Sequence, residues 1–233
     1  MLGKLNQLDQ IQLQQHQITE NIHNGLQMRV FDYIFRLLNQ AEKRKEIEYI
    51  ISCSYLEIYN EQIYDLLSLN YDTLQLREDI QKGIYVENLT QEVISSSRDA
   101  VSMLVKGQQK RHVGMTNMNE YSSRSHSVFC LSVQQKIQQQ NYEVAHVKDS
   151  KIYFVDLAGS ERQKQAVSAG ERLKEAQNIN KSLTTLGLVI NALAEQFSNG
   201  KQRHIPYRDS QTYFFTQRFF RWKFKNFYDC YVQ

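Results

Sequence analysis

The sequence predicts an α/β fold, in which helices cover both faces of a β-sheet. Helical and extended patterns alternate along the chain, and this order is typical of the class. The longest helical pattern spans residues 170–194, whereas 151–157 contains a continuous apolar run and 127–135 alternates between two faces. We expect the last two segments to be neighbouring strands of one sheet, connected through residues 138–141.

The preceding elements follow from local patterns in chain order. Residues 1–24 are rich in Gln and Asn, and their spacing allows only a frayed amphipathic helix. Apolar residues then recur at helical spacing from 29 to about 45, and basic residues close this helix. Residues 49–59 favour a buried strand, and residues 74–87 favour a short β excursion that is broken near Gly83.

A further helix is predicted over residues 97–109. Ser96 or Ser97 can act as its N-cap, because a serine hydroxyl accepts a hydrogen bond from the N–H groups of a first turn. Gly107 is expected near the end of this helix, where glycine is common.

The composition is that of one soluble globular domain. The chain has 233 residues, of which 41% are hydrophobic and 23% are charged. A net charge of +3 is too small to indicate a polyanionic partner by itself, and no apolar run reaches the roughly 18 residues of a membrane span. The cysteines, Cys53, Cys130 and Cys230, have neither metal-like nor paired spacing. We therefore expect reduced packing residues of a cytosolic protein rather than ligands or disulfides.

Two polar motifs carry the chemistry. Residues Asn119–His126 read N-E-Y-S-S-R-S-H, and residues Val155–Glu161 read V-D-L-A-G-S-E after an apolar strand. Hydroxyl and carboxylate oxygens suit Mg²⁺, and a glycine lets a backbone N–H approach a phosphate. Taken singly, the first motif could be a solvated serine-rich turn and the second an ordinary strand end. Together they predict a sensor for the γ-phosphate of a nucleotide.

Three further segments complete a family pattern. Ser54–Leu67 reads S-Y-L-E-I-Y-N-E-Q-I-Y-D-L-L, Asn178–Ala194 reads N-I-N-K-S-L-T-T-L-G-L-V-I-N-A-L-A, and His204–Ser210 reads H-I-P-Y-R-D-S. With the two motifs above, they resemble a core strand, the relay helix, the microtubule-facing loop, switch I and switch II of the kinesin motor domain. The stretches E-R-Q-K and G-K-Q-R-H-I-P-Y-R-D-S lean toward the kinesin-twelve class.

The resemblance implies a fold, an activity and partners. It implies a P-loop NTPase-like kinesin motor fold with a mixed central sheet, and ATP hydrolysis coupled to movement along microtubules. ATP and Mg²⁺ are the implied cofactors and tubulin the implied partner, with no nucleic acid and no membrane, at the microtubule cytoskeleton of the cytoplasm. Residues 25–210 would form a partial motor domain, preceded by the Gln-rich segment 1–24 and followed by an aberrant tail, 211–233.

Catalytic roles follow from matching switch I and switch II residue by residue. Ser122 would position the attacking water. Arg124 would pair with Glu161 when both switches close over ATP, because such a pair forms only when the two loops approach the γ-phosphate. The alternative is that Arg124 and Glu161 are ordinary surface charges.

Nucleotide contacts are implied for five other residues. Ser123 would ligate Mg²⁺ directly and Asp156 through water, and the Gly159 N–H would contact the γ-phosphate. Asn119 and His126 would frame the switch I loop.

For the C-terminal third of the chain, the resemblance implies transmission of switch II movement and binding to the microtubule. Asn178 would link switch II to the relay helix, whose apolar stripe also predicts core packing. A basic loop would contact the acidic tubulin surface through Lys201, Arg203, His204 and Arg208, although such charge runs are usually solvated faces. Arg77 and Lys82 would add a second contact.

The given sequence contains no phosphate loop of the form G-x-x-x-x-G-K-[ST], whose N–H groups and lysine hold phosphates. Gly-Lys occurs at residues 3–4 and 200–201, without the following Ser or Thr. We therefore expect weak ATP binding and no microtubule-stimulated ATPase from the chain alone. We also expect some aggregation, since the strand at 151–157 would lack its neighbour on the side away from 127–135. The alternative function is a non-catalytic microtubule-binding or interaction protein derived from a kinesin.

The tail after Ser210 departs from the family. It reads Q-T-Y-F-F-T-Q-R-F-F-R-W-K-F-K-N-F, whereas a one-base shift of a back-translated sequence gives K-L-T-F-L-L-K-D-S-L-D-G-N-S-K-T, which resembles the family continuation. We hypothesise a one-base frameshift immediately after Ser210, which cDNA reads would test. The alternative is a genuine tail that binds membrane or nucleic acid through aromatic and basic side chains.

Overall fold

The computed structural model describes four stretches of the chain and single positions of a fifth. The stretches are residues 25–80, 83–113, 125–137 and 146–159, and the single positions lie in a helical segment between 181 and 198. The described residues form two compact units. The first unit holds residues 25–55, 91–108, 128–137 and 146–156, and the second holds the remainder.

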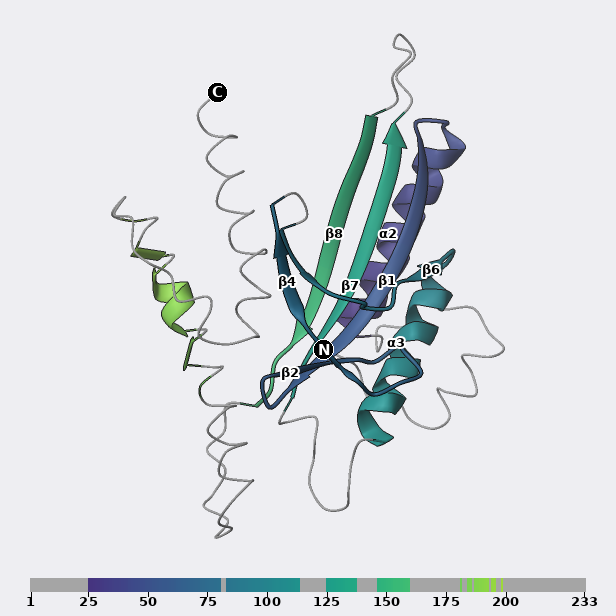
Figure 1. The fold of residues 1–233 in the computed structure, drawn as a ribbon. Coiled ribbons are helices and arrows are strands. Elements are labelled where there is room, and N and C mark those ends of the chain that lie inside the picture. The colour runs from purple at the N-terminus through teal and green to yellow at the C-terminus, as the bar shows by residue number, and fades with distance from the viewer. Residues whose placement is uncertain are drawn as a thin grey trace, which may run out of the picture. The chain divides into compact units, whose positions relative to one another are not determined.

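Among the described residues, six strands form one sheet (Figure 1). Its order is β3-β2-β1-β7-β8, and β6 also pairs with β1. The strands are β1 (Ile47–Tyr59), β2 (Gln62–Asp65), β3 (Thr73–Leu74), β6 (Glu92–Ile94), β7 (His126–Ile137) and β8 (His146–Asp156). A separate two-stranded antiparallel sheet consists of β4 (Leu76–Asp79) and β5 (Gly83–Val86).

These strands confirm the predicted α/β class with a central sheet. The strand predicted at 49–59 is β1, which pairs antiparallel with both β2 and β6. The segments predicted as neighbours are β7 and β8, which are adjacent in the sheet, and the predicted β excursion is the β4–β5 pair. Asn60 and Glu61 join β1 to β2 with φ angles of 51° and 59°, as a two-residue hairpin turn matching the strand twist requires.

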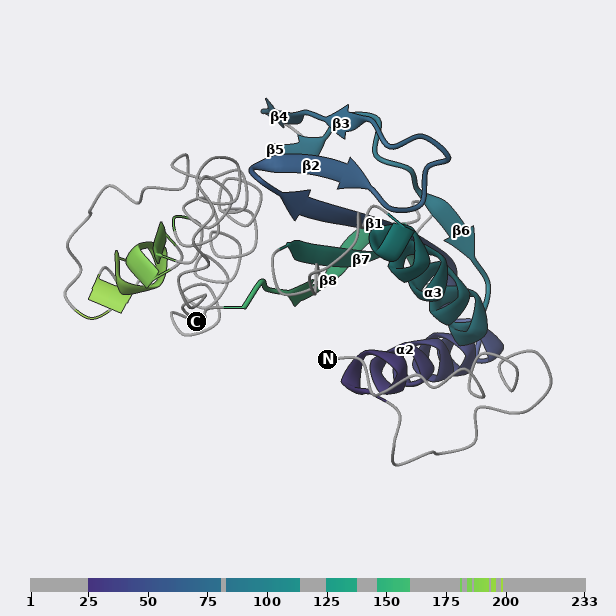
Figure 2. The same ribbon diagram turned by 90° about the horizontal axis from the view of Figure 1, so that it is seen from below.

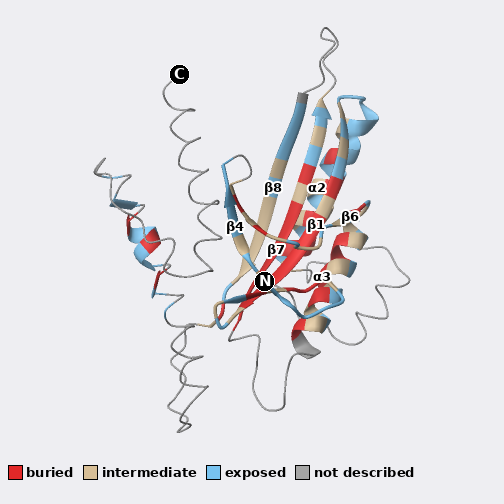
Figure 3. Ribbon diagram, in the orientation of Figure 1, coloured by how far each residue is buried: buried red, intermediate tan, exposed pale blue. Residues whose placement is uncertain are grey.

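Aromatic rings fill the core of the first unit between the sheet and helix α2 (Leu26–Lys43). This helix confirms the one predicted from residue 29 to about residue 45. Phe31 of α2 lies 5.3 Å from Phe129 of β7 and 5.3 Å from Phe154 of β8, between ring centroids. Tyr55 of β1 meets Phe129 at 5.4 Å. Figure 2 shows α2 beside the strands of the sheet, and Figure 3 shows buried residues concentrated on β1 and β7. Burying each such ring stabilises the unit by about 1.5–3 kcal/mol.

Helix α3 (Ser97–Val113) begins as predicted and ends later than predicted. Ser96 is the N-cap, since its hydroxyl accepts a hydrogen bond from the Asp99 N–H at 3.2 Å, and Asp99 accepts from the N–H and hydroxyl of Ser95. The prediction that Gly107 lies near the helix end was wrong, because the helix continues to residue 113. Tertiary contacts stabilise the added turn: the Lys110 ammonium donates to three backbone carbonyls at 2.6–2.9 Å.

The cysteine prediction is confirmed where the structure describes it. Cys53 and Cys130 are buried and free, and Cys230 lies outside the described residues. In the described stretches, no helix is both long and apolar enough to cross a membrane. The same stretches contain no cluster of three or more His, Cys, Asp or Glu side chains that could hold a metal ion.

Candidate functional site

Three of the predicted site residues lie among the described ones: His126, Asp156 and Gly159. The others lie outside the described residues; they are Asn119, Ser122, Ser123, Arg124, Glu161, Asn178, Lys201, Arg203, His204 and Arg208. Arg77 and Lys82 form the second predicted microtubule contact; Arg77 lies among the described residues and Lys82 lies outside them. The described part of the site is therefore the end of the switch I motif, residues 125–126, and the first part of the switch II motif, residues 155–159.

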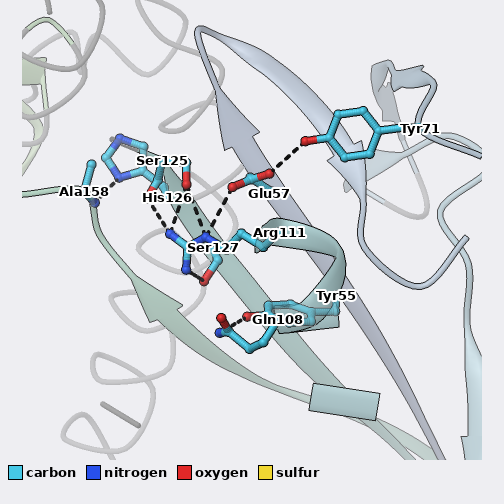
Figure 4. A network of polar contacts seen from close by, with 9 residues as sticks. All are labelled: Tyr55, Glu57, Tyr71, Gln108, Arg111, Ser125, His126, Ser127 and Ala158. Carbon is cyan, nitrogen blue, oxygen red and sulfur yellow. Dashed lines mark hydrogen bonds and ion pairs between the residues drawn. The ribbon is translucent and has the colours of Figure 1, made fainter. Parts of the chain in front are cut away.

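The end of the switch I motif and the residue after it are anchored in the interior of the second unit. Ser125, His126 and Ser127 are 0%, 4% and 2% exposed, and we call them the foot segment. Ser125 directly precedes strand β7, and His126 and Ser127 begin it; in extended chain, successive side chains point to opposite faces. Ser125 and Ser127 therefore face one way and His126 the other (Figure 4).

Arg111 of α3 holds the serine side of the foot segment. Its Nη2 donates to the Ser125 carbonyl at 2.9 Å and to the Ser125 hydroxyl at 3.0 Å. Its Nη1 donates to the Ser127 hydroxyl at 3.3 Å, and its Nε to the Ser125 hydroxyl at 3.2 Å. One guanidinium therefore holds the carbonyl of Ser125 and the hydroxyls of both Ser125 and Ser127.

Glu57 of β1 is the counter-ion of Arg111. Its Oε1 lies 3.2 Å from Arg111 Nε, and the two side chains are 0% and 2% exposed. Its Oε2 accepts a hydrogen bond from the Tyr71 hydroxyl at 3.1 Å. Tyr71 stacks on Tyr64 with ring centroids 4.6 Å apart, and burial together with the Glu57 carboxylate raises the pKa of Tyr64. Glu57 and Arg111 therefore form a buried ion pair, and each of the two side chains has further hydrogen-bond partners.

His126 joins the two switch motifs on the other side of the foot segment. Its Nδ1 accepts a hydrogen bond from the Ala158 N–H at 3.0 Å (Figure 4). Nδ1 therefore carries no proton in this arrangement, and a neutral imidazole has its proton on Nε2. Ala158 is 4% exposed and lies within the switch II motif, directly before Gly159. The prediction that His126 frames switch I thus acquires a definite contact, a bond to the switch II backbone.

Asp156 and Gly159, two of the predicted nucleotide contacts, lie at the end of β8 and just beyond it. Asp156 is the last residue of β8, and it is half-buried. Gly159 is also half-buried. A carboxylate at a strand end suits a Mg²⁺-bound water, and a glycine allows a phosphate to approach its N–H. These two residues fit the implied cofactor, and the third predicted donor, Ser123, is outside the described residues.

Arg77, from the second predicted track contact, is exposed on β4. Its side chain forms an ion pair with Glu87 at 2.9 Å, with side-chain exposures of 57% and 41%. A pair so open to water contributes little to stability.

Sequence reasoning missed the polar network of Glu57, Tyr71 and Arg111. One signal was present: Glu57 stands between Leu56 and Ile58 in a strand predicted to be buried. A charged residue at such a position needs a buried partner. The partner itself could not be read from the sequence, because Arg111 is 54 residues away.

A family model described as "Kinesin motor domain" matches residues 10–220. The curated relatives include the kinesin-like protein KIN-12E of Oryza sativa subsp. japonica, 47% identical over 220 residues, which cover 93% of this chain and 11% of that protein. KIN-12E of Arabidopsis thaliana is 52% identical over 200 residues, covering 84% of this chain and 16% of that protein. Both relatives bear the predicted class number. The chain therefore spans only 11–16% of the length of these relatives.

Solved structures give the same comparison at the level of the fold. A KIF14 dimer with AMP-PNP in complex with a microtubule matches with a TM-score of 0.73 and 41% identity, covering 85% of this chain and 56% of that one. A fast kinesin matches with a TM-score of 0.71 and 40% identity, covering 86% of this chain and 54% of that one.

Proposed function

Because the chain belongs to the kinesin motor-domain family, we propose that it works as a microtubule motor that couples ATP hydrolysis to movement along microtubules. The observation that carries the proposal is the bond between His126 and Ala158. It joins the end of one switch motif to the middle of the other, and both motifs must respond to the same γ-phosphate in such a motor.

The proposed cofactors are ATP and Mg²⁺. The magnesium ion would neutralise the charge that develops on the phosphates during transfer. Ser123 would hold the ion through its hydroxyl and Asp156 through a water, while Gly159 would donate its N–H to the γ-phosphate. Asn119 would frame the loop with His126. A solved relative whose bound nucleotide is AMP-PNP supports this assignment.

The proposed catalytic residues lie in the switch motifs. Ser122 orients the attacking water, and Arg124 pairs with Glu161 when both loops close. Closure around the γ-phosphate strengthens every electrostatic contact inside the site, because water is excluded from it. Closure is also the event that a motor can transmit, since it exists only while the γ-phosphate is bound.

The proposed partner is the microtubule, which places the protein at the microtubule cytoskeleton. The basic loop carries the main contact through Lys201, Arg203, His204 and Arg208. Exposed Arg77 adds a second one, with Lys82. Asn178 links switch II to the relay helix, so that track binding and nucleotide state influence each other. Support comes from the solved relative that is described in complex with a microtubule.

Co-sedimentation with stabilised microtubules tests the proposal. We expect the chain to pellet with microtubules, and a full-length motor that includes a phosphate loop to do so more strongly with AMP-PNP than with ADP. Arg208→Ala should weaken binding by about three- to tenfold. Lys106→Ala is the matched control, since Lys106 is an exposed lysine of α3 outside the basic loop. Binding that ignores the nucleotide would indicate a non-catalytic microtubule-binding protein, and no binding would contradict the proposal.

A further inference from the structure

Arg111 is a buried charge that no step of the proposed function uses. Its side chain is 2% exposed, and it lies in the last turn of α3, beyond the end of the helix that the sequence predicted. Burial of a guanidinium is costly, and an apolar pair of similar volume is often as stable as a buried ion pair. Stability alone therefore does not account for an arginine at this position.

The geometry of Arg111 is directed at the foot segment. Its nitrogens donate to the carbonyl and hydroxyl of Ser125 and to the hydroxyl of Ser127, at 2.9–3.3 Å. Glu57 receives one bond, from Nε, at 3.2 Å. A planar guanidinium has several donors in fixed directions and can hold these acceptors at once, whereas a lysine ammonium cannot reproduce that pattern.

The foot segment adjoins the proposed catalytic residues. Arg124 directly precedes Ser125, and Ser123 precedes Arg124. With the carbonyl of Ser125 held, Arg124 can change its direction only through the soft backbone dihedral angles of Arg124 and Ser125 themselves. A displacement of about 1 Å at a catalytic group can lower a rate by about a hundredfold. A fixed foot therefore matters to the chemistry even though it lies beside the reacting groups.

We propose that Arg111 is a positioning residue that fixes the foot segment, so that Ser123 and Arg124 meet the nucleotide in one orientation. Arg111 acts through Ser125. Glu57 orients the guanidinium, and the Tyr71 hydroxyl orients Glu57. The kinetic consequence rests on the proposed function, whereas the anchoring of the foot segment does not.

The test compares Arg111→Lys with Gln108→Met in the full chain. Arg111→Lys keeps a positive charge for Glu57 and removes the planar donors. Gln108→Met is the matched control, because it removes a hydrogen bond of 2.6 Å from the same helix to the Tyr55 hydroxyl and leaves the bonds from Arg111 to the foot segment in place. Hydrogen exchange of peptides covering residues 125–130 is measured in the chain itself, and kcat and KM for ATP with microtubules are measured with the same substitutions in a full-length motor that includes a phosphate loop.

We expect Arg111→Lys to speed exchange of the foot amides by about tenfold or more and to lower kcat by about ten- to a hundredfold, with KM for ATP changed by less than about threefold. Gln108→Met should change neither. If Arg111→Lys does not fold, Ser125→Ala combined with Ser127→Ala removes the hydroxyl acceptors and keeps the ion pair, and it should lower kcat severalfold. Unchanged foot exchange, or equal kcat losses in variant and control, would overturn the inference. A full-length motor without stimulated ATPase, but with faster foot exchange in Arg111→Lys, would refute the proposed function and retain the anchor.

Discussion

Replacing Glu57 with Met removes a buried carboxylate at similar volume. The guanidinium of Arg111, 2% exposed, then has no counter-charge. Breaking a buried pair by removing one partner costs about 3–5 kcal/mol, because the remaining charge has no water around it. We therefore expect Glu57→Met and Arg111→Met each to lower the free energy of unfolding by about 3–5 kcal/mol. The double variant should lie within about 2 kcal/mol of the wild type, since two apolar side chains leave no charge unpaired.

Urea unfolding, followed by circular dichroism, measures these free energies. The matched control is Glu87→Met, which breaks the half-exposed pair with Arg77 and should cost less than about 1 kcal/mol. Single losses below about 1 kcal/mol that add up in the double variant would refute the reasoning. They would mean that Glu57 and Arg111 do not stabilise each other in the folded chain.

Three further predictions concern single side chains. The variant His126→Asn can keep an acceptor at the position where Nδ1 accepts from the Ala158 N–H, whereas His126→Gln cannot. Only His126→Gln should therefore speed hydrogen exchange of the Ala158 amide and lower the free energy of unfolding by about 1–3 kcal/mol. Equal effects of the two variants would contradict the bond. Hydrogen bonds from Ser95 hold the pKa of Asp99 below its ordinary value, so its contribution to stability is present above about pH 4 and fades as pH falls through the lowered pKa. Asp99→Asn should flatten that acid dependence in thermal melts, and an unchanged slope would count against it. Burial, with Glu92 and Cys130 nearby, raises the pKa of Cys53 to about 12, so peptide mapping should find it alkylated at about pH 8 only after unfolding; rapid labelling of the folded chain would be the contrary result.

The fold could be predicted where local pattern and burial agree. The helix α2 and the strand β1 were predicted because apolar spacing and strand-forming residues mark them directly. The end of α3 was missed because Gly107 looked like a stop signal, while the contacts that extend the helix come from Lys110 and Arg111 to residues far along the chain. Tertiary contacts override a local signal of that strength.

The candidate site divides in the same way. His126, Asp156 and Gly159 could be named from the motifs because chemistry and spacing are written in consecutive residues. The Glu57–Arg111 pair could not, since its partners meet only in the folded sheet. The bond from Ala158 to His126 likewise joins residues 32 positions apart. Motifs therefore predict the groups that we propose to act on the nucleotide, and the structure was needed to identify the groups that contact their neighbours.

Microtubule-stimulated ATP hydrolysis by charge-swapped variants tests the central claim most directly. The claim is that the two switch motifs form one latch around the γ-phosphate. In a full-length motor that includes a phosphate loop, the account predicts stimulation by microtubules, loss of that stimulation in Arg124→Glu and in Glu161→Arg, and partial recovery when the two swaps are combined. Losses that simply add in the double variant, or a full-length motor that microtubules do not stimulate, would contradict the account.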